Sequence, residues 1–489
     1  MKKSILLFIL LFGLLSASLF AEEGNIGGNE EVIEVDIPDE LNHTDGNSQL
    51  TQTDGAFPGS NQPVSEKTYD FKGKFTGWIS GGVKENHSTY FNYDRLQLEL
   101  TELYHEITFY VKANARYNTI YLNDADTDRR GENVRFDLAE AYVNYEKTFD
   151  TALSQFNLLI GQQVFKWGKA DEVRPTDILS PQDLTLFALE DRNDRKLGRF
   201  ALKTAIAFGS ALRFEGIWMP IHRASESTQD EQSLFTQKSM IELQKNGFSV
   251  NSTQMPEKKL KESDIALKMY ANLLGTDFSF SFYNGYDPLP FSKLLDPMGL
   301  KKLQPFLSRV TLWGLDFERV AFAGIVVRGE AAYFSKGMKF GVSPENFALY
   351  SAKGMDGVDG KRFLDATLGL DKNDFLIAKA YLNLQYSVNH IFDYEEGLKS
   401  RYGTKTEKTN HALIWNLSYE FGGLNYKIEF SGNYNFSQKD FMLKPAFHIK
   451  MGAETKIILG AYLFGGDEDT LLGQYSDKSF GYLKLEHLF

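Results

Sequence analysis

Apolar and polar side chains alternate with a period of two along most of the chain after residue 70. In segment 107–117 the apolar series is Ile107, Phe109, Val111, Ala113, Ala115 and Tyr117, and the residues between them are Thr108, Tyr110, Lys112, Asn114 and Arg116. Successive side chains of a β-strand point to opposite faces, so this alternation predicts strands with one apolar and one polar face. The same pattern recurs in 265–273, 378–389, 411–421 and 424–436. Several of these runs have the length of about 9 to 11 residues that a tilted strand needs to cross a bilayer.

The pattern predicts a membrane barrel more than a soluble sheet. Aromatic residues stand near the ends of the apolar faces, as Tyr117, Tyr333, Phe421 and Phe436 do, which is typical of girdles at the two membrane interfaces. Only helices and closed barrels leave no backbone group unpaired in hydrocarbon. We therefore expect an all-β fold, a transmembrane antiparallel β-barrel of about 16–18 strands. A soluble sandwich or β-helix is the alternative, and the charges on the polar face of strand after strand argue against it.

The first 68 residues predict two further segments. Lys2 and Lys3, the apolar run 5–15 and the small residues before Ala21 have the layout of a signal peptide over residues 1–21. An uncleaved membrane anchor is the alternative. Residues 22–68 are acidic and lack an apolar face, which predicts a flexible periplasmic leader, with a plug or partner-binding tail as the alternative. The barrel is then expected over residues 69–489, in the cell outer membrane.

Connections of two kinds alternate between the predicted strands. Tight turns are expected at Gly422-Gly423, at Lys372-Asn373 and at 208–210. Long connections are expected over 220–261, 287–308, 335–361 and 394–410. Short turns on one side and long charged loops on the other are typical of outer-membrane barrels.

The last residues form one more amphipathic strand, with Gly481, Leu483, Leu485 and Phe489 on one side. A terminal Phe behind alternating apolar residues resembles the signal that the barrel-assembly machinery recognises, although His487 departs from the usual apolar residue. Phe489 is therefore the predicted assembly signal. The assembly machinery and outer-membrane lipid are the predicted partners.

Three groups of short motifs resemble a known family. They are GQQVFKWG at 161–168 with Lys169-Ala170-Asp171 and 177–183, then 314–317 with 328–330, and finally 368–371 with 385–386. These stretches resemble a porin-like, largely uncharacterised family of Gram-negative-type outer-membrane β-barrel proteins. The resemblance implies a channel or export function without a defined ligand. We interpret the glycines in these motifs as backbone-packing or bulge positions.

Charged residues on the polar faces are the candidates for lining a pore. They are Lys112, Arg116, Arg328, Glu330, Lys379, Lys427 and Glu429. Because both signs occur, we expect no strong ion preference; the alternative is that these charges only keep a filled lumen soluble. The facing also predicts that Leu382→Arg impairs assembly while Asn383→Arg is tolerated. The charged segment 169–196 is predicted to narrow the lumen, with Asp171, Arg174, Asp177 and Asp183 as its candidate residues; a solvated surface loop is the alternative.

Composition excludes several other functions. The 489 residues include no cysteine, which removes disulfides, thiolate metal sites and cysteine nucleophiles. The net charge of -12 argues against nucleic acid as a partner. No histidine pair has metal-ligand spacing and no nucleotide-binding motif occurs, so we expect no metal, no cofactor and no enzyme activity.

The leading hypothesis is therefore a channel for passive diffusion or export of small hydrophilic solutes. An adhesin acting through long loops and, less favoured, an outer-membrane hydrolase are the alternatives, and a homo-oligomer stays open.

Overall fold

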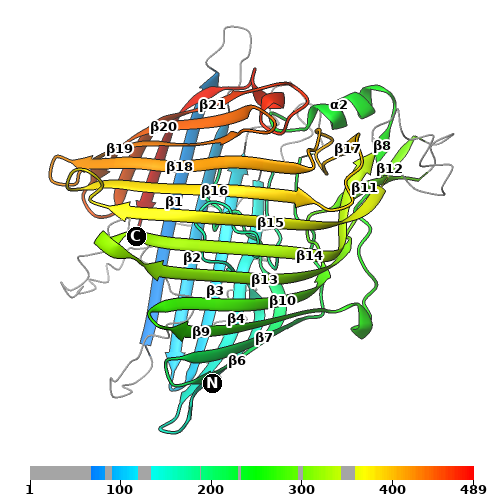
Figure 1. Ribbon diagram of the computed structural model, residues 1–489. Coiled ribbons are helices and arrows are strands. Elements are labelled where there is room, and N and C mark those ends of the chain that lie inside the picture. The colour runs from blue at the N-terminus through cyan, green and yellow to red at the C-terminus, as the bar shows by residue number, and fades with distance from the viewer. Residues whose placement is uncertain are drawn as a thin grey trace, which may run out of the picture. The chain divides into compact units, whose positions relative to one another are not determined.

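The computed structural model describes residues 68–82, 91–118, 134–187, 189–228, 233–295, 301–342 and 358–489. The predicted signal peptide and leader, up to residue 67, lie outside these described residues. Eighteen of the strands within them form a single barrel wall (Figure 1). They are β1 (Thr68–Gly82), β2 (Asn92–Tyr104), β3 (Ile107–Asn118), β4 (Val134–Thr148), β5 (Leu153–Gln163), β6 (Arg199–Phe208), β7 (Leu212–Met219), β9 (Asp264–Leu273), β10 (Thr276–Tyr286), β13 (Arg309–Val320), β14 (Val326–Val342), β15 (Val358–Asn373), β16 (Ala380–Ile391), β18 (Thr409–Phe421), β19 (Tyr426–Asn435), β20 (Asp440–Met451), β21 (Thr455–Gly465) and β22 (Phe480–Leu488).

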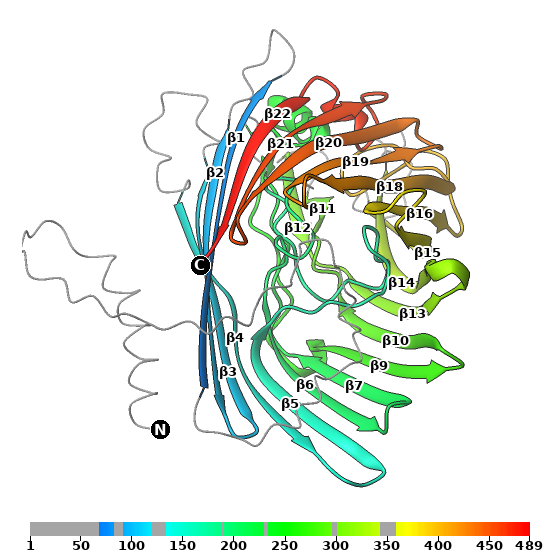
Figure 2. The same cartoon turned by 90° about the vertical axis from the view of Figure 1, so that its left-hand side faces the viewer.

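The wall closes on itself. Each of these strands pairs antiparallel with the next one along the chain, and β22 pairs with β1, so that no edge of the sheet stays open. Figure 2 shows the strands curving around an enclosed interior. The predicted all-β, antiparallel barrel is confirmed, at the upper end of the expected strand number. No helix in the described part of the chain is long and apolar enough to cross a membrane.

The two ends of the barrel differ. At the short-turn end, eight connections of two to six residues join the strands. Two of them, 209–211 and 422–425, correspond to the turns predicted at 208–210 and at Gly422-Gly423. The strand ends Thr68 and Leu488 lie at this end too, because Thr68 pairs with Leu103 and Leu488 with Lys74. At the long-connection end lie further elements: α2 (Lys238–Lys245), β8 (Ser249–Val250), η2 (Leu260–Glu262), β11 (Phe291–Leu294), β12 (Lys302–Phe306), β17 (Leu398–Lys399) and η4 (Gly473–Tyr475). A 3-10 turn, η3 (Phe322–Gly324), is part of the short-turn end.

Two predicted connections were wrong. Lys372 and Asn373 belong to β15, and the chain turns at 374–379, where several residues adopt a positive φ. The long connection expected from residue 335 starts only after Val342, because a bulge in β14 allows the strand to continue. Its remaining residues, 343–357, lie outside the described residues.

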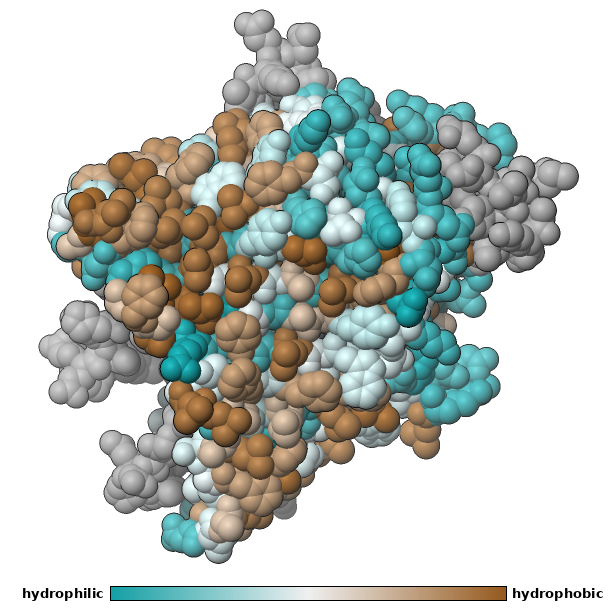
Figure 3. Space-filling model, viewed as in Figure 1, coloured by the Kyte–Doolittle hydropathy of each residue, from teal (hydrophilic) through white to brown (hydrophobic). Residues whose placement is uncertain are grey.

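The alternation of side chains places apolar residues outside. Phe109 and Tyr117 of β3 are exposed, whereas Asn114 and Arg116 between them are buried inside the barrel. Outward residues such as Leu368, Leu417 and Phe430 follow the same rule. Figure 3 shows this face as largely apolar toward the short-turn end and hydrophilic toward the long-connection end. Such an outer surface requires hydrocarbon around it.

The interior at the long-connection end is packed with apolar side chains as well. Trp78, Tyr462 and Phe480 of the wall contact Leu189 and Tyr475 of the connections in one buried cluster. A second cluster contains Trp167, Tyr283 and Leu312. The alternation of apolar and polar residues does not predict these clusters, because at the long-connection end the inward-facing residues of the strands are apolar as well.

Candidate functional site

The connection between β5 and β6, described over residues 164–187 and 189–198, lies inside the barrel and is called the luminal loop below (Figure 2). Its hydrogen bonds reach both β2 and β14. Counted around the ring of eighteen, β2 is the second strand and β14 the eleventh, which places them on opposite sides. The luminal loop therefore crosses the lumen and does not form a solvated surface loop.

Glu330 of β14 holds the first half of the luminal loop. One of its carboxylate oxygens accepts hydrogen bonds from the backbone N–H groups of Lys169 (3.1 Å) and Ala170 (3.2 Å). The other oxygen accepts from the N–H (2.6 Å) and the hydroxyl (2.7 Å) of Thr176. Gly168 has a φ of +87°, and a side chain there would collide with the Glu330 carboxylate. Glu330 is thus a wall carboxylate that fixes the path of the loop backbone.

A cluster of charges beside Glu330 attaches Asp171. Arg328 of β14 pairs with Asp171 (2.9 Å) and also with Asp371 of β15. The amide of Asn383 on β16 donates to Asp171 over 2.6 Å. Gln385 extends this attachment, because its Oε1 accepts from the N–H groups of Glu172 and Val173, both at 3.1 Å.

Residues 168–171 of the first motif thus meet the motifs at 328–330, 368–371 and 385–386 at one place. Gly314 of the remaining motif leaves room for Thr176, whose methyl group a side chain there would contact.

Arginines of β2 and β3 hold the second half of the luminal loop. Arg95 pairs with Glu190 (3.0 Å) and with Asp194 (2.5 Å), and the Tyr93 hydroxyl also donates to Glu190 over 2.7 Å. Arg116 pairs with Asp183 over 2.5 Å. On β21, the Tyr462 hydroxyl donates to the carbonyl of Leu189 over 3.0 Å. Both sides of the lumen therefore supply partners to the loop.

Asp177 is the centre of the ion pairs within the loop. Its carboxylate accepts from Lys196 at 2.6 Å, from Arg192 at 3.3 Å and from the N–H of Trp167 at 3.2 Å. Burial acts to raise the pKa of Asp177, but the charges of Lys196 and Arg192 outweigh it and hold this pKa below its usual value. Burial lowers the pKa of Lys196 to about 8, against the opposing effect of Asp177.

The remaining predicted residues lie on the wall or in the turns. Lys112 pairs with Glu99 of β2 at 3.0 Å, and Lys427 pairs with Glu429 on its own strand at 2.6 Å. Arg174 donates to the Ala170 carbonyl inside the luminal loop.

Lys379 was wrongly placed on the lumen face. It lies exposed in the turn before β16, because that strand begins only at Ala380.

Phe489 exchanges two backbone hydrogen bonds with Gly73 of β1, of 2.7 and 3.0 Å, at the seam of the barrel. A side chain at position 73 would collide with the Phe489 ring, so Gly73 leaves the space that the ring occupies.

Several residues that attach the loop were missed from the sequence. Arg95 lies on the inward face of an alternating strand, so the pattern that found Arg116 was sufficient to find it. Gln385 lies in one of the family motifs and Asn383 on the predicted inward face, but neither was predicted to contact the loop, because a neutral amide on a polar face is ordinary. The described residues contain no group of three or more His, Cys, Asp or Glu side chains that could hold a metal ion.

A family model matches most of the chain. A family described as "Protein of unknown function (DUF1302)" matches residues 80–480. The chain belongs to this family. The DUF1302 match confirms the resemblance to an uncharacterised porin-like family and spans every strand from β2 to β21 together with the luminal loop. A comparison with curated proteins found no match.

Solved structures of other proteins match most of the chain at low sequence identity. Acinetobacter baumannii OccAB1 is 8% identical, with a TM-score of 0.46, and the match covers 87% of this chain and 97% of that one. Pseudomonas aeruginosa OccD3 (OpdP) is 9% identical, with a TM-score of 0.45, over 89% of this chain and 96% of that one. Salmonella typhi OmpF in complex with daunomycin is 10% identical, with a TM-score of 0.42, over 86% of this chain and 97% of that one. At these identities and TM-scores, the matches carry no property of those proteins over to the present chain.

Proposed function

We propose that this member of the DUF1302 family is an outer-membrane channel for small hydrophilic solutes. A closed barrel with an apolar outer face and charged inward residues supports this proposal, because such a wall offers a polar path through hydrocarbon. The single observation that carries it furthest is the luminal loop attached to opposite sides of the wall. In this proposal the chain is exported by a cleaved signal peptide and inserted by the barrel-assembly machinery with Phe489 as its signal.

The luminal loop is proposed to narrow the path and to set which solutes pass. Asp171, Asp177 and Asp183 act in this proposal by holding the loop, because each is engaged by a cation of the wall or of the loop. The charges that a passing solute would meet are then the half-buried ones on the inner wall, such as Lys112 and Lys456. We keep the expectation of a weak ion preference, since Glu99 and Glu486 pair with these two lysines.

Planar-bilayer recording tests the channel directly. Purified full-length chain is expected to give discrete current steps that change in size when the loop attachment is altered by Glu330→Gln. A silent bilayer, with protein shown by gel mobility to be folded, would contradict the channel.

One observation favours a second function, a surface interaction protein with a filled lumen. The apolar cluster around Trp78, Tyr462 and Tyr475 packs wall against connections at the long-connection end. A barrel sealed there presents its long connections to partners but conducts nothing, so the same recording separates the two proposals.

A further inference from the structure

Four cationic side chains lie on the outer surface at the long-connection ends of three neighbouring strands. They are Arg309 of β13, Lys336 and Lys339 of β14, and Arg362 of β15, and are called the basic rim below. A bulge in β14 creates part of this rim, because Phe334 pairs with Phe363 while Met338 pairs with Lys361. Ser335, Lys336 and Gly337 therefore stand opposite the single residue Arg362. The bulge turns Lys336 outward, where it is exposed.

Positive charge on the basic rim is only partly compensated. Arg309 pairs with Glu262 at 3.6 Å, and Arg362 pairs with Asp393 at 2.9 Å. Within the part of the chain that the structure describes, no ion pair includes Lys336 or Lys339, and Asp359 nearby pairs with the inward Lys361. Four cations against two paired carboxylates leave a positive patch.

The rim arginines are held in place by neighbours. The Arg309 guanidinium donates to the Asn284 side chain over 2.7 Å and lies 5.4 Å from the centre of the Tyr286 ring. Arg362 lies 5.5 Å from the centre of the Phe392 ring. Fixed guanidinium groups bind a phosphate at a smaller entropic cost than mobile ones.

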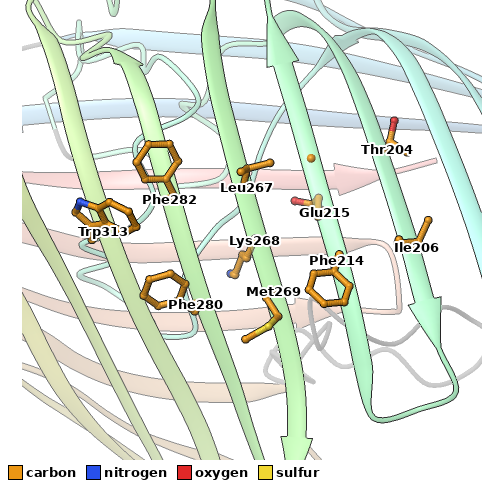
Figure 4. Close-up of a pocket in the computed structure, with 11 residues that line it drawn as sticks. Thr204, Ile206, Phe214, Glu215, Leu267, Lys268, Met269, Phe280, Phe282 and Trp313 are labelled. Atoms are coloured by element: carbon orange, nitrogen blue, oxygen red, sulfur yellow. The ribbon is translucent and has the colours of Figure 1, made fainter.

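An apolar groove opens on the same outer face, nearer the middle of the strands (Figure 4). Its volume is about 690 Å³, and its lining includes Ile206, Phe214, Leu267, Phe280, Phe282 and Trp313. Gly216 leaves the space free, since an added Cβ there would come no closer than 3.7 Å to Leu267. The rings of Phe282 and Trp313, 4.7 Å apart, form one side of the groove.

The distance between groove and rim fits a single lipid. Trp313 and Arg309 are four residues apart on β13, which is ~13 Å at ~3.3 Å per residue. That span stays within one leaflet, about half of the ~30 Å hydrocarbon thickness.

We propose that this surface binds a phosphate-bearing, multi-acyl lipid of the leaflet at the long-connection end. The phosphates contact the basic rim and one acyl chain occupies the groove. The cations lie directly above apolar wall, which favours a membrane lipid over a soluble phosphate. This proposal shares with the proposed function the position of the barrel in a membrane, but it does not require conduction.

Lipid A, added to the purified full-length chain in detergent and followed by native mass spectrometry, is the test. The double variant Lys336→Gln/Lys339→Gln is expected to weaken lipid A binding about tenfold, because two phosphate contacts are removed. Lys258→Gln/Lys259→Gln removes the same charge from exposed residues of the connection between β7 and β9, and is expected to change binding less than about twofold. Gly216→Leu fills the groove and should also weaken binding, while both lysines stay.

The outcomes that overturn the proposal are distinct. Equal losses in the two double variants would mean unspecific charge attraction, and unchanged binding by Gly216→Leu would exclude the groove. Displacement of lipid A by millimolar inorganic phosphate would assign the rim to a soluble anion. Gel mobility with and without heating shows whether each variant is folded. If the double lysine variant is not folded, Arg362→Gln is tested in its place. Current recorded without lipid A reports on the channel separately.

Discussion

Glu330→Gln is the most informative change in the lumen, because one carboxylate accepts four hydrogen bonds from the luminal loop. Glutamine keeps the length of the side chain and one acceptor oxygen. Its NH₂ group, however, faces two donors that had an oxygen before. Two hydrogen bonds are therefore lost, and a negative charge is removed.

The size of the effect follows from the strength of such bonds. A hydrogen bond to a charged group contributes ~1.5 kcal/mol at the lower end of the usual range, so the loss of two weakens the attachment by ~3 kcal/mol. The population with a released loop should rise on the order of a hundredfold, at ~1.4 kcal/mol per factor of ten.

Limited trypsin digestion measures this population. Lys169, Arg174 and Lys196 are cleavage sites within the luminal loop, and cleavage reports the fraction of opened loop when reclosing is fast. The matched control is Glu429→Gln, because Glu429 contacts Lys427 and His448 of the wall. Equal digestion rates for the wild type and Glu330→Gln, or an equal rise in the control, would refute the role of Glu330.

Three further predictions concern other parts of the barrel. Arg95→Gln leaves Glu190 and Asp194 without their main cation. The attachment of the luminal loop should therefore weaken by ~3–5 kcal/mol. Unchanged trypsin cleavage at Arg192 would contradict this expectation. Leu417→Arg places a charge on the exposed lipid face and should destabilise the barrel folded in vesicles by ~2–4 kcal/mol. Asn416→Arg, one residue away and facing inward, should refold normally. Similar denaturation midpoints for the two variants would exclude the assigned facing. The lowered pKa of Asp177 means that its stabilising contribution is complete above about pH 4 and lost as the pH falls through its folded value. The part of the conductance that depends on Asp177 should then be steady above about pH 4 and change below, and a change below about pH 4 that persists in Asp177→Asn would show that another group controls the loop there.

The structure also changes one expectation drawn from the sequence. Asn383→Arg was expected to be harmless because residue 383 faces the lumen. Asn383 is 2% exposed, and its amide donates to Asp171 of the luminal loop. An arginine there would compete with Arg328 for the space beside Asp171, so Asn416 is the better inward control.

The site was predictable to the extent that it depends on charge and facing. Arg116, Arg328 and Glu330 were found because each is a charge on the polar face of a strand. Their partners were not predictable, because Glu330 and Thr176 are 154 residues apart and no local pattern relates them. Lys379 was misplaced because alternation continues by chance through a turn, and only backbone pairing shows where β16 begins.

By itself the sequence determined the wall: a period of two with apolar residues on one side produces strands, and strands in hydrocarbon must close so that every backbone group is paired. Strand order also follows from the chain, since each wall strand pairs with the next. Only the tertiary structure decided what fills the interior, because closure brings β2 and β14 to opposite sides of a space that the luminal loop can cross. The register between β13, β14 and β15, with the bulge in β14, likewise places Arg309, Lys336 and Arg362 side by side at one rim.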